Sequence, residues 1–569
     1  MTSFRLTIVS CLLATTPSAF AAGTWNPDPR LGNVEAHRQL YELGRAWGDT
    51  HFDAAASMIS QKPKSRDHMV RESIYYAYTL LLTGDPDDRA KAQPIIKNVI
   101  AEQDIRANSV WRGAFLWTSL SKWSDQRNPD LNTAAFIGTG LAEIAELDRR
   151  KPCLDPDVRS AVDAAGKLAV EEVIRRNVDP GYTNIALLST ALAAAGAKLW
   201  AVPGADKWAD DKLSTVLKLA GDGAVYEYSS PTYSAVDLSA AYMIRQFAFN
   251  DAFAAKGDAI IDHLWKELSS AYHAPSYQLG GPYNRAYGND MLTYAAGLKY
   301  FLFLALDGKY PLPVQPDLAH GWDQGGLGML AALPVKPRPE FQQTPPAERT
   351  WIATGPSDGV HASRELHQSR DGNFILGTVV SQDEWKQKRN LVADWRTDVT
   401  TAPGYKIGFC IDETNETLPN GFPYATIQFR SQQKGSAALV LLDAQRALPP
   451  SGAASLVFDT GATVVDPKAS PIVVQDGAIT TYLYPISNGQ VAYESHEDIK
   501  GDQHTVQVNR AWSTADALGK VHAISYLVVF HPADKPAPKV SDLALKDDAG
   551  QISVSATVDG VPLSITMSE

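Results

Sequence analysis

Apolar residues recur at intervals of three and four along the first half of the chain. This period places them on one face of an α-helix. The pattern holds in residues 34–47, 66–84, 129–150, 155–176, 183–202, 205–222, 234–249, 258–272 and 289–306. Asp or Pro begins several of these segments and Gly ends several, as expected of helix caps. Helices of similar length joined by short loops predict hairpins stacked around an axis, an α/α toroid. A straight solenoid is the alternative, although no repeat-family signature is visible.

The period changes to two after a proline-rich stretch. Prolines concentrate in residues 316–349, which predicts a linker. From residue 350 onward, apolar and polar residues alternate in short runs separated by Gly, Asn or Asp, which predicts antiparallel strands. The fold class predicted is α+β multidomain: an α/α toroid (an incomplete barrel of helical hairpins) over 22–315, the linker, and an antiparallel β-sandwich over 350–569.

Residues 1–21 have the composition of a secretory signal peptide. Arg5 precedes a short apolar run, and Ala19-Phe20-Ala21 supplies the small residues of a cleavage site. No later segment approaches the length of a membrane-spanning helix. We therefore expect a periplasmic or secreted protein without a membrane anchor.

Charge and cysteine content narrow the classes of function. The formal net charge of −12 becomes −13 when Arg5 leaves with the signal peptide, and such an acidic protein is not expected to bind nucleic acid. An anionic sugar polymer stays compatible with it, because a cleft can be locally basic. Cys153 and Cys410 remain after Cys11 is removed. We expect two buried free thiols, with one long-range disulfide as the alternative.

Familiar catalytic and cofactor motifs are missing from the sequence. It contains no Gly-x-Ser-x-Gly, no His-Glu-x-x-His, no phosphate-binding loop and no dinucleotide fingerprint. The acidic, histidine-containing segment 493–504 lacks regular ligand spacing, so we expect a solvated polar turn there. No metal ion or cofactor is predicted to be required.

Three segments of the helical half place polar side chains at helix edges. Tyr182 and Asn184 precede an apolar helix, Glu227 lies among tyrosines in the turn 226–233, and residues 283–287 follow a Gly-Gly-Pro break. Each has an ordinary explanation: a helix cap, tyrosines packed between helices, and a rigid turn with a surface arginine. Together they supply an amide, a carboxylate, phenols and a guanidinium at successive inner edges of one toroid.

This set of groups suits β-elimination from a uronic acid polymer. The neighbouring carboxylate must be neutralised before the proton on carbon 5 can be removed, and an arginine, an amide or a protonated carboxyl can do this. A base then removes that proton, and an acid protonates the departing oxygen on carbon 4. One tyrosine can do both when the two groups share a ring face, as in glucuronate and mannuronate. A nearby guanidinium lowers the pKa of the phenol from its usual value of about 10.

The order of these residues resembles that of known polysaccharide lyases. Asn184, the segment 227–233 and Arg285 resemble the Asn…His…Tyr…Arg tetrad of chondroitin AC and hyaluronate lyases. The stretches 227–238 (EYSSPTYSAVDL) and 280–291 (GGPYNRAYGNDM) look still more similar to secreted polyuronate lyases of the glucuronan and alginate lyase type, which are built on an α/α toroid. The resemblance spans residues 110–305. It implies that Asn184 neutralises the carboxylate, that Tyr233 is base and acid, and that Arg285 supports both.

The sequence departs from that tetrad at one position. The expected histidine is absent, and Glu227 or Tyr228 occupies its place. Glu227 would either donate a hydrogen bond to the substrate carboxylate as a protonated acid or orient Arg285. Tyr287 competes with Tyr233 as the base, and His273 is a more distant competitor.

Aromatic, amide and basic residues near helix starts are candidates for binding sugar rings. The substrate-binding residues predicted are Trp111, Arg112, Asn132, Tyr182, Tyr228 and Tyr283. Trp117 is a further candidate for stacking on a sugar ring, with a core tryptophan at helical spacing as the alternative. Basic residues at 386–389 are expected to form a solvated loop, with a segment that reaches over the groove as the alternative.

The function predicted is a polysaccharide lyase acting on β-1,4-linked polyuronate. Glucuronan is the first choice of substrate, and mannuronate-rich alginate is the alternative because its stereochemistry allows the same mechanism. A glycoside hydrolase using two of Glu227, Asp237 and Asp290 is the rival enzyme. A non-catalytic polysaccharide-binding protein is the third interpretation.

Overall fold

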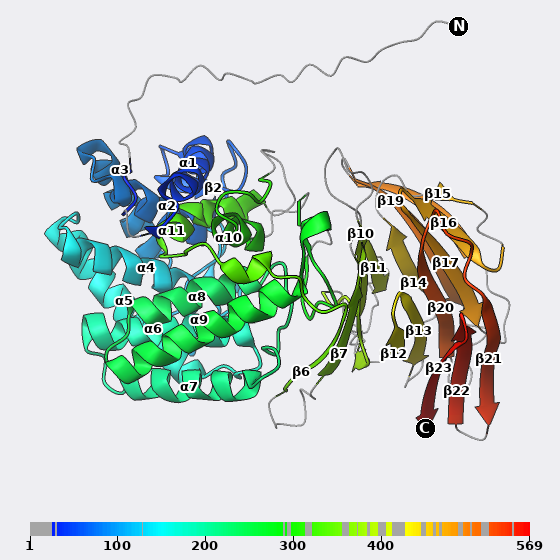
Figure 1. Ribbon diagram of the computed structural model, residues 1–569. Helices are drawn as coiled ribbons and strands as arrows, with labels where there is room; N and C mark the ends of the chain where they lie inside the picture. The colour runs from blue at the N-terminus through cyan, green and yellow to red at the C-terminus, as the bar shows by residue number, and fades with distance from the viewer. Residues whose placement is uncertain are drawn as a thin grey trace, which may run out of the picture.

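The structure is a computed structural model with helices on one side and sheets on the other (Figure 1). It describes residues 25–28, 31–127, 129–287, 291–292, 297–312, 321–355, 364–371, 374–383, 387–395, 406–411, 427–444, 451–458, 463–465, 469–486, 493–500, 503–513, 523–548 and 551–568. The predicted signal peptide (1–21), Asp290 and Lys386 lie outside these residues, as do the side chains of Cys410 and of 493–504.

The described helices form an N-terminal domain. They are α1 (Val34–His51), α2 (Val70–Thr83), α3 (Pro86–Ala101), α4 (Thr133–Arg150), α5 (Pro156–Arg176), α6 (Thr183–Trp200), α7 (Ala205–Ala220), α8 (Ser234–Gln246), α9 (Asp251–Ala271), α10 (Leu298–Ala305) and α11 (Leu327–Ala332). Their ends follow from local sequence. Asp85 and Asn250 cap α3 and α9 with their side chains, and Gly84 ends α2 in the left-handed conformation.

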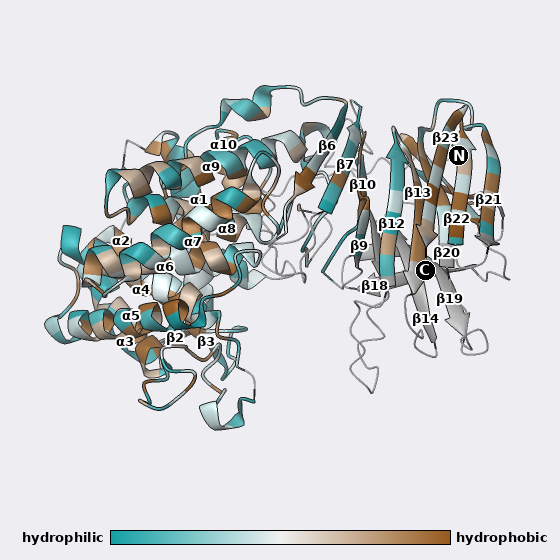
Figure 2. Cartoon of the chain, turned by 90° about the horizontal axis from the view of Figure 1, so that it is seen from below, coloured by the Kyte–Doolittle hydropathy of each residue, from teal (hydrophilic) through white to brown (hydrophobic). Residues whose placement is uncertain are grey.

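The helices are arranged in two concentric layers. The inner helices α2, α4, α6 and α8 pack one against the next, and α10 and α1 close the ring between α8 and α2. The outer helices α3, α5, α7 and α9 each pack on an inner neighbour. Figure 2 shows hydrophilic and hydrophobic positions interleaved along α5 and α7, as expected where one face is buried. This arrangement is the predicted α/α toroid.

The C-terminal half is built from antiparallel sheets in three layers. An eight-stranded sheet has the order β18-β19-β14-β11-β10-β8-β7-β6, a seven-stranded sheet β15-β16-β17-β20-β13-β12-β9, and a third sheet β21-β22-β23. The bounds are β6 Glu348–Ala353, β7 Arg364–Arg370, β8 Phe374–Val379, β9 Ser381–Asp383, β10 Leu391–Trp395, β11 Lys406–Ile411, β12 Ile427–Lys434, β13 Ala437–Ala444, β14 Ser451–Phe458, β15 Thr463–Val464, β16 Ile472–Asp476, β17 Ile479–Ile486, β18 Tyr493–Lys500, β19 Gln503–Ser513, β20 Ala523–Pro532, β21 Val540–Asp548, β22 Gln551–Val558 and β23 Val561–Ser568.

Successive side chains of β13 point into two different cores, which is why the sheet carries a layer on each of its faces. Val440 faces the core between the two large sheets, whereas Leu439 and Leu441 face the core against the third sheet. The predicted β-sandwich is therefore present, and its seven-stranded sheet is covered on both faces. The segment 316–349, predicted as a linker, contains η4 (Gly321–Gly326) and α11, and α11 packs against α1.

The eight-stranded sheet lies directly against the loops at one end of the toroid. Tyr283 and Arg389 exchange backbone hydrogen bonds of 2.9 Å in both directions, and Ala224 N–H donates to the carbonyl of Ile352 at 3.0 Å. A Cβ on Gly377 would lie 1.8 Å from the carbonyl oxygen of Gly281, so only glycine permits this approach. The sheet domain thus holds the loop 280–287 in place.

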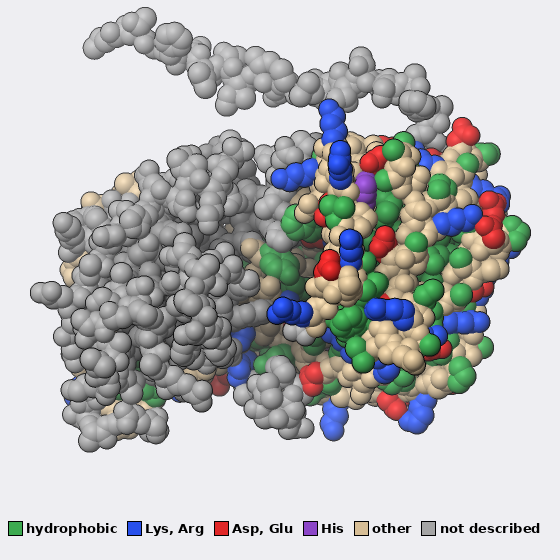
Figure 3. All heavy atoms as spheres, turned by 180° about the vertical axis from the view of Figure 1, so that it is seen from behind, with side chains coloured by type: hydrophobic (Ala, Val, Ile, Leu, Met, Phe, Trp, Pro, Cys, Tyr) green, Lys and Arg blue, Asp and Glu red, His purple; other side chains and the backbone are tan. Residues whose placement is uncertain are grey.

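Three further features concern the surface charge, the hydropathy of the helices and the one described cysteine side chain. On the face in Figure 3, charged side chains of both signs are interspersed over the helical domain. Among the described residues, no helix is long and apolar enough to cross a membrane. Cys153 is a free thiol, and burial raises its pKa to about 11, so it is unreactive.

Candidate active site

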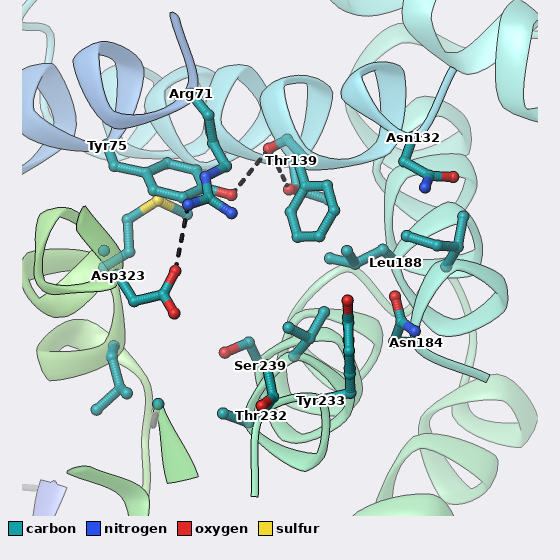
Figure 4. Close-up of a pocket in the computed structure, with 18 of the residues that line it drawn as sticks. Arg71, Tyr75, Asn132, Thr139, Asn184, Leu188, Thr232, Tyr233, Ser239 and Asp323 are labelled. Carbon is teal, nitrogen blue, oxygen red and sulfur yellow. Dashed lines mark hydrogen bonds and ion pairs between the residues drawn. The ribbon is translucent and has the colours of Figure 1, made fainter. Parts of the chain in front are cut away.

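A cavity of about 410 Å³ opens at the mouth of the toroid, where the inner helices meet the loops that face the sheet domain. Figure 4 shows side chains from α2, α4, α6, α8 and the η4 segment pointing into it. Its lining includes Asn132, Tyr182, Asn184, Tyr233, Arg285 and Tyr287. Six of the eleven predicted site residues are therefore brought together, although they span more than 150 positions of the sequence.

Glu227 lies behind this wall and connects its members. The carboxylate is 3% exposed. It accepts hydrogen bonds from the backbone N–H of Asn184 at 2.8 Å, from Asn184 Nδ2 at 2.6 Å and from Arg285 Nη1 at 2.7 Å. A carboxylate that accepts from three donors serves as an anchor. Of its two predicted roles, the geometry matches the orientation of Arg285 and does not match donation to a substrate.

A second buried acid, Glu267, holds the turn that contains Glu227. Glu267 of α9 accepts the backbone N–H groups of Val225 at 3.1 Å and Ser229 at 3.0 Å. Ser229 has a φ of 46°, a conformation that L-residues seldom adopt, and these hydrogen bonds help hold it. Glu227 also satisfies an N–H at the start of α6, which has no capping side chain of its own.

Tyr233 stands at the start of α8, and its side chain lines the cavity. Its backbone N–H donates to Ser230 Oγ at 2.8 Å, and that hydroxyl in turn binds the carbonyl of Arg285. Arg285 Nη2 donates to Tyr233 Oη at 2.8 Å, and the guanidinium carbon lies 3.9 Å from the centre of the tyrosine ring. The oxygens of Tyr233 and Tyr287 are 2.5 Å apart.

Burial and charge act on Tyr233 in opposite directions. Burial raises the pKa of the phenol well above its usual value, and the adjacent Tyr287 and Glu227 raise it further, whereas Arg285 lowers it. For Arg285, burial lowers the pKa, but Glu227 and the tyrosines more than compensate and keep it above its ordinary value. The guanidinium is thus a permanent charge held against a neutral phenol.

The amide of Asn184 is directed by Glu227. Because the carboxylate of Glu227 can only accept hydrogen bonds, the amide nitrogen Nδ2 of Asn184 must be the atom that faces it. The amide oxygen Oδ1 of Asn184 is buried and has no hydrogen-bond partner among the described residues. The amide nitrogen carries two hydrogens. One binds Glu227, and no hydrogen bond of the other is seen among the described residues.

Two predicted substrate-binding residues form a pair beside this group. Asn132 Nδ2 donates to Tyr182 Oη at 3.0 Å, and Arg176 Nη1 donates to Asn132 Oδ1 at 2.8 Å. The guanidinium of Arg285 lies 5.4 Å from the ring centre of Tyr182. Tyr182 is thus linked through Asn132 to Arg176 on one side and lies beside Arg285 on the other.

Four predicted substrate-binding residues do not line the cavity. Tyr228 and Tyr283 are fully buried. Tyr228 packs in the core between the two large sheets and donates to Gln382 Oε1 at 2.9 Å, and Tyr283 packs against Val392. Trp111 stacks on Trp123, outside the toroid mouth. Arg112 Nη1 lies 3.3 Å from Glu171 on the outer helix α5. Burial therefore corrects the prediction for Tyr228 and Tyr283, whereas the roles of Trp111 and Arg112 stay predictions for a surface outside this cavity.

Two other candidates from the sequence, His273 and Asp237, are buried and do not line the cavity. Burial lowers the pKa of His273 to about 4, and its Nδ1 contacts Ser276 Oγ at 2.7 Å, so it acts as a structural residue. Asp237 is fully buried, does not line the cavity, and has a pKa that burial and Glu227 raise well above the usual range.

Among the described residues, no cluster of His, Cys, Asp and Glu could hold a metal ion.

Apart from Trp117, the residues at the far end of the cavity are ones that the sequence did not single out. Arg71 and Tyr75 of α2, Trp117, and Trp322 and Asp323 of η4 line it. Arg71 lies inside an ordinary amphipathic pattern, and Trp117 has the spacing of a core tryptophan. Only the closure of the ring, which brings η4 next to α2, reveals them.

Comparisons with known proteins find similar folds at low sequence identity. The structure of heparinase III matches with a TM-score of 0.46 and 10% identity, over 96% of this chain and 93% of that one. A heparan sulfate lyase from Pedobacter heparinus matches with 0.34 and 9%, over 95% and 90%. A glycosyl hydrolase of family 88 from Bacteroides vulgatus matches with 0.35 and 12%, over 53% and 97%. No curated protein matches this sequence.

One family model covers more than half of the chain. It matches residues 38–333, which contain all the helices from α2 to α11 and every residue of the cavity wall. The chain therefore belongs to the DUF8769 family, described as a domain of unknown function.

Proposed function

We propose that this protein is a polysaccharide lyase that cleaves chains at a uronate by β-elimination. The observation that carries the proposal is the row of contacts from Glu227 through Arg285 to Tyr233 and Tyr287 along one cavity wall. It combines a fixed positive charge, two phenols and an amide donor, which are the groups that the elimination requires.

Tyr233 is the proposed base and acid. Its phenol passes its proton to the oxygen of Tyr287 while Tyr287, which is 42% exposed, releases its own proton to water, so that the one negative charge left behind lies on Tyr233. The phenolate, stabilised by Arg285, then removes the proton from carbon 5. When the bond between carbon 4 and its oxygen breaks, the same hydroxyl returns that proton to the leaving oxygen, so Tyr233 ends as it began.

Neutralisation of the substrate carboxylate falls to Arg285 and to the second N–H of Asn184. Both are held in place by Glu227 before substrate arrives, so little reorganisation is needed as charge develops on the carboxylate. Tyr182, whose ring centre lies 5.4 Å from the guanidinium of Arg285, can add a hydroxyl.

Hydrolysis is less well supported by the same geometry. An acid and a base carboxylate must flank the bond across open space. Glu227 is occupied by three donors, and Asp237 does not line the cavity. Asp290 lies outside the described residues.

The test is the ultraviolet absorbance of the unsaturated uronate product. Purified protein is incubated with polyglucuronate (glucuronan), the first choice from sequence, and with polymannuronate, the alternative. Hyaluronate and heparan sulfate are included as chains in which a uronate alternates with a second sugar. Tyr233→Phe and Tyr287→Phe variants accompany the wild type.

The outcomes separate the candidate mechanisms. Absorbance that rises with wild type and is lost in Tyr233→Phe supports the elimination and its base. A rise that survives in Tyr233→Phe and is lost in Tyr287→Phe moves the base to Tyr287. New reducing ends without absorbance would exclude the elimination and favour a hydrolase.

A further inference from the structure

The two ends of the cavity differ in charge. At one end Arg285 is balanced by Glu227, and the remaining groups are phenols and an amide. At the far end Arg71 is the cationic side chain in a group that also holds Glu72, Asp323 and Asp130. One cation and three acids do not attract an anionic ligand.

Arg71 and Asp323 are arranged to bind hydroxyl groups. Arg71 Nε donates to Glu72 Oε1 at 2.7 Å, and Nη2 donates to Asp323 Oδ1 at 3.2 Å. Nη1 of Arg71 and Oδ2 of Asp323 have no hydrogen-bond partner among the described residues, and both side chains line the cavity. Figure 4 shows the two side chains meeting at the cavity wall, Arg71 from α2 and Asp323 from the neighbouring η4. A donor beside an acceptor matches a sugar hydroxyl, which is both.

Aromatic side chains complete this end. Trp117 lies 5.6 Å from the guanidinium of Arg71 and donates from Nε1 to Asp130 Oδ2 at 3.1 Å, which fixes its ring. Trp322 precedes Asp323 and is 37% exposed, an unusual exposure for a large apolar ring at a cavity wall. Aromatic rings with a few polar groups between them are typical of sites that bind small polar ligands such as sugars.

We propose that the Arg71–Asp323 end of the cavity is a second subsite that binds an uncharged sugar ring next to the uronate held by Arg285. The inference rests on the proposed elimination and narrows its substrate. A chain in which glucuronate alternates with a neutral sugar fits both ends, whereas a homopolymer places a second carboxylate among Glu72, Asp130 and Asp323.

The experiment compares two tetrasaccharides, one alternating glucuronate with N-acetylglucosamine and one of glucuronate alone. We expect wild type to show a kcat/KM at least about tenfold higher on the alternating substrate, because the acids of the far end repel a second carboxylate. Asp323→Asn removes one acid without changing shape and should narrow this preference severalfold. Asp211→Asn, an equal charge change on the outer helix α7, should leave it unchanged.

Binding is measured in parallel through tryptophan fluorescence, with Trp322→Phe to assign the signal. Equal or reversed preference in wild type, or a preference that Asp323→Asn does not alter, overturns the subsite while leaving the elimination intact. Absence of unsaturated product from every substrate overturns the elimination instead. In that case the subsite is still supported if the alternating tetrasaccharide binds more tightly than the glucuronate tetrasaccharide and Asp323→Asn reduces this difference in affinity. Any other binding result overturns the subsite as well.

Discussion

At the scale of single residues, the candidate site is held together by one carboxylate that does not line the cavity. Glu227 holds Asn184 and Arg285 at 2.6 and 2.7 Å, and through Arg285 it holds Tyr233. It lies in the sequence zone where the resembling lyases have histidine. The sequence showed that an acid is present there, but its partners come from two other segments, so its role as an anchor followed only from the folded chain.

Replacing Glu227 by Gln tests this role. The variant keeps the shape of the side chain but loses the charge that positions Arg285, and we expect kcat to fall by roughly 100-fold or more, as for loss of one preorganised charge contact. The measurement is the initial rate of product formation, with circular dichroism to confirm folding.

Asp237→Asn is the matched control for that variant. Burial raises the pKa of Asp237 well above its ordinary value and so favours the uncharged form, and an isosteric amide should therefore leave the rate within about twofold of wild type. Equal losses in both variants would contradict the assignment of Glu227 as the anchor.

At the scale of elements, the inner helices are linked by buried polar contacts far from the cavity mouth. Glu143 of α4 accepts hydrogen bonds from Gln246 Nε2 of α8 at 3.0 and 2.9 Å. Burial raises the pKa of Glu143 to about 7. The helical periodicity predicted both helices, but it assigns a polar residue to solvent and did not indicate this contact.

The raised pKa of Glu143 makes the stability of the toroid depend on pH. The folded-state pKa of about 7 exceeds the ordinary value of 4.5, so the folded protein binds an extra proton between these values. The free energy of unfolding therefore falls as pH rises from about 4.5 to about 7, by an amount on the order of 3 kcal/mol. Glu143→Gln should remove this part of the slope, and should be more stable than wild type at about pH 8 but similar at about pH 4.5.

Urea unfolding at several pH values measures that effect. Glu171→Gln, a substitution of an exposed residue on α5, should retain the wild-type dependence on pH. Parallel curves for wild type and Glu143→Gln would show that Glu143 does not titrate in this range.

At the scale of the whole molecule, the sheet domain contributes to the candidate active site. Gln387 accepts a hydrogen bond from Arg285 Nε at 2.8 Å, and the backbone of 387–389 pairs with that of 283–286. The sequence predicted two domains of the right classes, but for 386–389 it favoured a solvated loop over a segment that reaches the groove. Contacts between segments a hundred residues apart leave no periodic signal.

Gly377→Ala tests the coupling between the domains. The added Cβ would lie 1.8 Å from the carbonyl oxygen of Gly281 and must displace the loop that carries Arg285. We expect a loss of about 1–3 kcal/mol in stability and a fall in kcat of at least about tenfold.

Gly435→Ala provides the comparison. Gly435 has a φ of +52° and open space around it, so alanine there costs about 1 kcal/mol of stability without touching the loop. Unfolding curves and kcat are measured for both. A normal kcat in Gly377→Ala would show that the sheet domain does not position Arg285.

The sequence by itself determined the classes of both domains and most of the chemistry of the cavity wall. Those features are encoded locally: the period of apolar residues selects helix or strand, and Asn184, Tyr233 and Arg285 lie at helix edges, where breaks in the pattern are visible. Tertiary structure decided which tyrosines face the cavity. Tyr228 and Tyr287 look alike in sequence, but one is buried under the sheet and the other is exposed at the mouth. Ring closure likewise made the Arg71–Asp323 end, because it joins elements some 250 residues apart.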